Sequence, residues 1–232
     1  MNGGRRVQEK KFAILNGNHL KLIAAFAMLM DHAGILLLPK ITLFRILGRL
    51  AYPIFAFMIA EGCRYTQNKL RYFLMVFGLG AACQLVYYFV SGDTYLNILL
   101  TFSCSILLIY CLQALYNEQD WLRQFLLSLL FACLFAGVYG LTHLVTIDYG
   151  FWGVLLPVGV YLARDRKTSL AYTAAFLALL ALELWEGQWF ALAAIPLLAM
   201  YNGRRGRLNI KWLFYFYYPA HLAVLWGIAY LM

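Results

Sequence analysis

The first long apolar stretch of the chain reads LKLIAAFAMLMDHAGILLL from Leu20 to Leu38. About 20 consecutive apolar residues are enough for a helix to cross the hydrocarbon core of a membrane. Apart from Lys21 at its start, the ionisable residues of this stretch are Asp31 and His32, which lie side by side in its middle. A charged side chain near the bilayer centre costs between about 3 and about 10 kcal/mol or more, so such residues usually line a cavity, pair or take part in chemistry. The stretch therefore predicts a transmembrane helix that carries a functional site.

The composition extends this prediction to the whole chain. Of its 232 residues, 64% are hydrophobic and 12% are charged, which is typical of multi-pass membrane proteins and lies outside the ordinary globular range. We expect an all-α transmembrane helix bundle that forms one domain over residues 1–232, with residues 1–19 as a cytoplasmic segment. The five cysteines form no C-x-x-C pair and have no close histidine, so we expect packing roles for them and no metal site.

Charge clusters and turn signals divide the chain into about nine candidate spans of suitable length. They are residues 20–38, 43–62, 70–90, 96–115, 122–141, 149–163, 169–186, 188–201 and 212–231. The sixth and the eighth are short and contain Pro157 and Pro196, so either could be a broken or re-entrant segment. Pro53 and Pro219 each remove one backbone hydrogen bond from their spans, and kinks there would shape a pocket near the polar residues.

The distribution of lysine and arginine predicts the orientation of these spans. If the N-terminus is cytoplasmic, all but three of the 19 cations fall at cytoplasmic ends, whereas the opposite loops carry Asp93, Asp148, Glu183 and Glu186. An odd number of spans then places the C-terminus outside the cytoplasm. The net charge of +9 follows from this positive-inside bias and does not indicate a nucleic-acid partner.

Three cations break this rule, and two of them define the site. The three are Lys40, Arg45 and Arg49. Arg45 and Arg49 are four residues apart and share a helix face, and Asp31 is the anionic residue nearest to Arg45 in sequence. At 1.5 Å rise per residue, Asp31 and His221 both lie about 15 Å beyond the cytoplasmic ends of their spans. Neighbours on a helix point about 100° apart, so we expect Asp31 to face Arg45 or Arg49 and His32 to point at a second surface.

Glu61 and Asn97 each have two possible roles, and Tyr218 has one. Glu61 could form a solvated pair with Arg64, three residues later, or line the cytoplasmic mouth of a cavity. Asn97 could cap the span that it opens or reach the site. Tyr218 belongs to an aromatic run at 215–218, which is typical of an interfacial belt. No phosphate loop, zinc-ligand spacing or serine nucleophile elbow is present in the sequence, which argues against nucleotide hydrolysis.

Blocks spread over nearly the whole chain resemble the TraX family. They are Leu20-Lys21-x-Ile23-Ala24, Met30-Asp31-His32, Arg45-x-x-Gly48-Arg49-Leu50-Ala51-Tyr52-Pro53-Ile54-Phe55-Ala56-Phe57, Ala60-Glu61-Gly62, Leu96-Asn97, Asp148-Tyr149-Gly150, Tyr201-Asn202-Gly203 and Tyr218-Pro219-x-His221. Tyr52 stands where the family has phenylalanine, a departure that adds a hydroxyl near the site.

The family is named for a conjugative-pilus protein that N-acetylates pilin, and it looks related to polytopic transmembrane acyltransferases. The resemblance implies acetyl-CoA or another acyl-CoA as donor and a bacterial cytoplasmic membrane as location. It also implies a peptide, protein, glycan or lipid acceptor, although it does not identify which. The positions that would carry the function are Asp31, His32, Arg45, Arg49, Glu61 and His221.

Acyl transfer suits these residue types. A base must remove a proton from the acceptor, and histidine is the usual choice near neutral pH. His32 is the candidate base, with His221 and Asp31 as further catalytic candidates. Arg45 or Arg49 could stabilise charge on the thioester oxygen or on an anionic acceptor. The remaining candidates for substrate binding are Glu61, Asn97 and Tyr218.

Two other classes of protein remain open at this point. A transporter or flippase also places charges at the membrane midplane, although such folds usually have two corresponding halves and no convincing internal repeat is present. A non-catalytic assembly factor could use the Asp–Arg pair only to fix helix packing.

Overall fold

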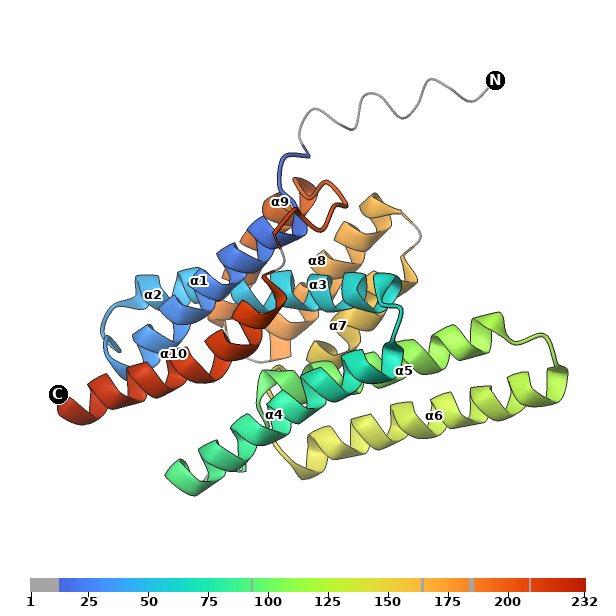
Figure 1. Cartoon of the computed structure of the whole chain (residues 1–232), viewed down its shortest axis with the longest axis horizontal. Helices are drawn as coiled ribbons and strands as arrows, with labels where there is room; N and C mark the ends of the chain where they lie inside the picture. The colour runs from blue at the N-terminus through green and yellow to red at the C-terminus, as the bar shows by residue number, and fades with distance from the viewer. Residues whose placement is uncertain (1–12, 93, 164, 184–185, 209) are drawn as a thin grey trace. The chain divides into compact units, whose positions relative to one another are not determined.

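The computed structural model describes residues 13–92, 94–163, 165–183, 186–208 and 210–232. Their regular secondary structure is helical, and the other backbone pairings in these ranges are isolated bridges between Leu15 and Tyr201 and between Leu96 and Ile147. The all-α prediction is therefore confirmed for the described residues (Figure 1). Part of the predicted cytoplasmic segment lies outside them, namely the cations Arg5, Arg6, Lys10 and Lys11.

The chain forms two compact units. The terminal unit combines the chain up to Met58 with the chain from Trp185 onward, and the central unit runs from Ile59 to Leu184. Helix α3 (Ala51–Tyr65) contributes its first residues to the terminal unit and the rest to the central unit.

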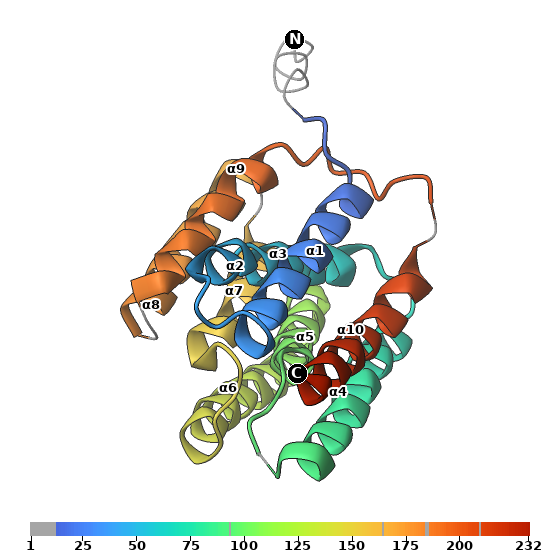
Figure 2. The same cartoon turned by 90° about the vertical axis from the view of Figure 1, so that its left-hand side faces the viewer.

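The terminal unit is built around α1 (Gly17–Leu36). Its other elements are α2 (Thr42–Gly48), η2 (Glu186–Ala193), α9 (Ala194–Ala199) and α10 (Lys211–Leu231). Helix α1 packs against α2 and α10, and α2 also contacts η2 (Figure 2). The start of α1 is fixed by Asn16, whose side chain accepts hydrogen bonds from the backbone N–H groups of Asn18 and His19.

Two glycines bring α1 and α2 close together. A Cβ atom on Gly34 of α1 would lie 2.9 Å from the Cβ of Phe44, and a Cβ on Gly48 of α2 would overlap the side chain of Asp31. Real Cβ atoms are not found at such separations, so larger residues at either position would push the two helices apart. This close approach lets the arginines of α2 reach Asp31.

The predicted span 43–62 is divided into two helices. Helix α2 ends at Gly48 and α3 begins at Ala51, which leaves Arg49 and Leu50 at the junction. Pro53 has no N–H to donate to the Arg49 carbonyl, and it lies in the first turn of α3, where no donor is required. The predicted span is confirmed by length and composition, since 42–65 together are long and apolar enough to cross a membrane, and it is interrupted at Arg49, close to the kink predicted from Pro53.

The central unit is organised around α5 (Ile98–Asn117). Its other helices are α4 (Lys69–Ser91), α6 (Trp121–Leu144), α7 (Gly150–Leu162) and α8 (Arg166–Glu183). Helix α5 packs against α4, α6 and α7, and α7 packs against α8. The first turns of α4, α5 and α6 are capped by Asn68, Asn97 and Asp120, whose side chains accept from backbone N–H groups.

Five helical segments are long and apolar enough to cross a membrane. They are Gly17–Leu36, Thr42–Tyr65, Lys69–Phe89, Ile98–Asn117 and Trp121–Leu144. Helix α6 has no buried residue in the described structure, so its surface suits contact with lipid. The predicted eighth span is a 3-10 helix followed by a short α-helix, whereas α7 continues through Pro157. The count of about nine spans and the orientation of the termini stay predictions.

Candidate functional site

The first part of the site is a charged cluster centred on Asp31 in α1. Nη1 of Arg45 donates a hydrogen bond to Oδ1 of Asp31 at 2.9 Å, and Nη2 of Arg49 donates to the same oxygen at 3.1 Å. The prediction that Asp31 faces these arginines is confirmed for both. A carboxylate that accepts from two guanidinium groups compensates charges that hydrocarbon would otherwise disfavour.

Gln188 extends the cluster from η2. Nη1 of Arg49 donates to Oε1 of Gln188 at 3.0 Å, and the glutamine is only 2% exposed. The Nε2 atom of Gln188 is buried without a hydrogen-bond partner in the described structure. Arg49 therefore bridges two elements that lie far apart in sequence, and its guanidinium is held in one orientation.

The second part of the site is a histidine pair. Nδ1 of His32 lies 3.0 Å from Nε2 of His221 in α10, and the ring centroids are 5.0 Å apart. His221 is 6% exposed. The prediction that His32 points at a second surface, away from the arginines, is confirmed by this contact.

A backbone carbonyl determines which ring nitrogens of the two histidines carry a proton. Nδ1 of His221 lies 2.8 Å from the carbonyl oxygen of Tyr217. A carbonyl can only accept, so with both rings neutral the proton of His221 is on Nδ1 and its Nε2 is an acceptor. In this arrangement Nδ1 of His32 donates to that Nε2, beside the backbone of Met28, which also hydrogen-bonds to the His32 ring. The lone pair of His32 is then on its own Nε2. Nε2 of His32, the ring nitrogen that is not bonded to His221, can therefore accept a proton.

Two tyrosines of α10 hold the His221 ring. The ring of Tyr217 stacks on it with centroids 4.9 Å apart and planes 11° apart, and Tyr218 packs edge-on at 5.8 Å. The Tyr217 hydroxyl also donates to the Ala25 carbonyl of α1 at 2.7 Å. Tyr218 is buried beside the histidine pair, a position that the interfacial reading of 215–218 did not predict.

Two of the predicted site residues belong to the central unit. Glu61 accepts from Nη1 of Arg64 at 2.8 Å, as predicted, but its side chain is buried and not solvated. Asn97 accepts from the N–H of Leu99 and donates to the Gly80 carbonyl, so its capping role is confirmed. Neither residue belongs to the unit that holds the histidine pair.

Sequence reasoning missed Gln188 and the part played by Tyr217. A single glutamine at the start of an apolar stretch was a visible signal, because a buried amide needs a partner. The Tyr217 contact uses a main-chain oxygen, which no side-chain pattern reveals. Among the described residues, no group of three or more His, Cys, Asp or Glu could hold a metal ion.

Comparison with known proteins finds a family and relatives that match this chain. The model of the TraX protein family matches residues 16–229. A probable fimbrial assembly protein FimC, serogroup H1, of Dichelobacter nodosus is 27% identical over 244 residues, covering 89% of this chain and 92% of the relative. An uncharacterized protein of Rickettsia prowazekii is 38% identical over 60 residues, which are 26% of this chain and 23% of that protein. No solved structure matches the chain.

The apolar helices and the charged cluster within them define a multi-pass membrane protein with polar side chains joined between its helices. Because the family model spans all but the ends of the sequence, the chain belongs to the TraX family.

Proposed function

We propose that the protein is a membrane-embedded acyltransferase. It moves an acetyl or other acyl group from acyl-CoA to an amine or hydroxyl of an extracytoplasmic or membrane-associated acceptor, such as a peptide N-terminus. Its location is the bacterial cytoplasmic membrane, with the N-terminus in the cytoplasm and the C-terminus outside.

The observation that carries this proposal is the chain of hydrogen bonds from His32 through His221 to the Tyr217 carbonyl. This series of hydrogen bonds keeps Nε2 of His32 unprotonated and fixes the orientation of its ring, as general-base catalysis requires. In the reaction, Nε2 of His32 takes the proton of the acceptor as its nitrogen or oxygen attacks the thioester carbon. The carbon–sulfur bond breaks, and the same proton passes from His32 to the CoA sulfur.

The charged cluster suits the same reaction. A negative charge develops on the thioester oxygen during the attack, and fixed cations stabilise it most strongly where water is excluded. Arg45 and Arg49 are cations held in place by Asp31, and Gln188 holds Arg49 a second time. Asp31 is thus assigned to positioning, and His32 to proton transfer.

Membership of the TraX family supports a particular class of acceptor. TraX proteins are associated with pilin acetylation, and the Dichelobacter nodosus relative is named as a probable fimbrial assembly protein. Both point to a surface-filament subunit or another exported peptide as the acceptor class. A transporter or a non-catalytic assembly factor of the same family would use the buried charges without consuming a thioester.

The test is thioester consumption by the purified full-length protein in detergent. Acetyl-CoA is supplied with short peptides carrying free N-termini, and the released thiol and the acetylated peptide are measured together. His32→Ala and His221→Ala are expected to lose the activity. His19→Ala is the matched control, because His19 lies on the same helix as His32 but is exposed. Full activity in both site variants would show that the assignment is wrong.

A further inference from the structure

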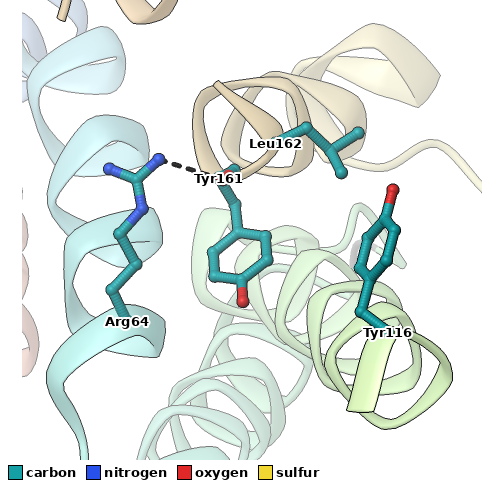
Figure 3. A pocket seen from close by; sticks show the side chains of 4 residues that line it. All are labelled: Arg64, Tyr116, Tyr161 and Leu162. Carbon is teal, nitrogen blue, oxygen red and sulfur yellow. Dashed lines mark hydrogen bonds between the residues drawn. The ribbon is translucent and has the colours of Figure 1, made fainter. Parts of the chain in front are cut away.

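A pocket lies at one end of the central unit. It has a volume of about 290 Å³ and is lined by Arg64, Tyr116, Tyr161 and Leu162 (Figure 3). All four residues lie at the C-terminal ends of their helices, α3, α5 and α7. None of them belongs to the charged cluster or the histidine pair.

The Arg64 side chain lines this pocket and is held in place by hydrogen bonds. Its Nη1 donates to Oε1 of Glu61 at 2.8 Å. Its Nη2 donates to the carbonyl oxygens of Val160, Tyr161 and Ala163 at 2.6, 2.9 and 2.9 Å. The last carbonyls of a helix have no partner within it, so the guanidinium completes the end of α7. With these bonds in place, Arg64 shapes the pocket with a guanidinium whose charge is paired with the Glu61 carboxylate.

The walls of the pocket are aromatic. The guanidinium carbon of Arg64 lies 5.7 Å from the centre of the Tyr161 ring. Figure 3 shows the rings of Tyr116 and Tyr161 projecting toward the same space from α5 and α7. Among the described residues, neither hydroxyl has a hydrogen-bond partner. Such rings offer stacking faces for a planar ligand, and every nucleobase has a face of this kind.

The same end of the unit carries its positive charge. Helices α3, α5 and α7 end there, and the short loops that follow lead into α4, α6 and α8. The first turns of those three helices contain Lys69, Arg71, Arg123, Arg166 and Lys167. The same end also carries the acidic residues Glu61, Glu118, Asp120 and Asp165, so with Arg64 it has six cations against four acids among the described residues. The opposite end carries Asp148 and Glu183 and, in the described part of this unit, no lysine or arginine. Positive charge of this kind attracts phosphate groups.

Resting on the proposed function, we propose that this pocket binds the purine base of the acyl-CoA donor, with the CoA phosphates among the cations that surround it. Pockets for drug-sized ligands start at about 300 Å³, so the volume suits one ring system and not the whole of CoA. A phospholipid headgroup would supply phosphate but no planar ring for the two tyrosines, which favours the nucleotide.

The experiment compares two donors in full-length protein. Acetyl-CoA carries the nucleotide, and acetyl-pantetheine lacks it. Tyr116→Ala is expected to raise the KM for acetyl-CoA by about 5- to 150-fold, which corresponds to the loss of one base-stacking contact. The kcat at saturation and the KM for acetyl-pantetheine are expected to stay unchanged. Tyr65→Ala is the matched control, because Tyr65 and Tyr116 are both 67% exposed but Tyr65 does not line the pocket.

Binding of adenosine 3′,5′-bisphosphate, measured by equilibrium dialysis, separates this proposal from the proposed reaction. Nucleotide binding that Tyr116→Ala weakens and Tyr65→Ala preserves supports the pocket even if no acyl transfer is detected. Acyl transfer with an unchanged KM for acetyl-CoA in Tyr116→Ala would overturn the pocket and leave the reaction standing. An equal rise in KM for both donors would also overturn it, as would binding only of phospholipid vesicles.

Discussion

The two units use their buried polar side chains in different ways. In the terminal unit, Asp31, Arg49 and His221 bond to side chains of other helices. In the central unit, Ser105 and Gln113 bond to main-chain carbonyls, and the buried ion pair of Glu61 with Arg64 lies within one helix, α3. Bonds to carbonyls satisfy helix backbones and fix packing, whereas ionisable side chains that bond from one helix to another inside a membrane are costly and mark function. The contrast locates the candidate site in the terminal unit.

The largest effect is expected from Asp31→Ala. This change removes the carboxylate from two guanidinium groups, and loss of one member of a buried ion pair costs about 3–5 kcal/mol. Thermal or denaturant unfolding in detergent measures the loss. Asp148→Ala in the central unit removes an acceptor from the neutral Tyr95 hydroxyl and should cost clearly less. Equal losses of unfolding free energy in the two variants would mean that these carboxylates contribute equally to stability in the two units.

The next largest effect is expected from His221→Phe. The phenyl ring can keep the stacking against Tyr217, but it cannot accept the proton of His32. Acyl transfer is expected to fall by about 100-fold or more, the usual contribution of an oriented base, while the unfolding temperature changes little. His143→Phe, an exposed histidine in the central unit, provides the comparison. A large loss of stability in His221→Phe with unchanged turnover would assign His221 to packing.

A matched pair of glutamines sharpens the contrast further. Gln188 and Gln113 are both buried, and each has one bonded end and one unbonded end in the described structure. Gln188 bonds to charged Arg49, and Gln113 donates to the Cys63 carbonyl at 3.0 Å. We expect Gln188→Leu to cost about 1.5–3 kcal/mol and Gln113→Leu about 0.5–1.5 kcal/mol, since bonds to charged groups are stronger. The reverse order in unfolding experiments would contradict this reading.

The smallest effect is expected from Ser105→Ala. Its hydroxyl donates to the Val154 carbonyl of α7 at 2.8 Å. Hydrogen bonds between membrane helices contribute about 0.6 kcal/mol on average, so the loss should be near that value and the acyl-transfer rate should not change. A tenfold fall in rate would extend the functional site into the central unit.

Helix geometry in the sequence was enough to predict the orientation of the Asp31 and His32 side chains. Adjacent positions diverge on a helix, and Arg45 and Arg49, which break the positive-inside rule, follow Asp31 on the next predicted span. Gln188 could not be paired with Arg49 in this way, because 139 positions separate them and the sequence left open whether 188–201 is a regular, broken or re-entrant segment. The interruption at Arg49 lies where the sequence predicted a kink, because Pro53 has no N–H to donate to the Arg49 carbonyl.

The last acceptor in the histidine chain is a main-chain oxygen, and this has a consequence for how the site can change over time. A carboxylate in that place could be lost through one codon change, but every amino acid at position 217 supplies the same carbonyl. The side chain there can vary without removing the group that sets the protons of His221. Mutagenesis of side chains alone will therefore not remove the carbonyl of residue 217, the last group in the chain of hydrogen bonds. Amide-to-ester replacement of the backbone, which weakens the carbonyl as an acceptor, is the chemical change that reaches it.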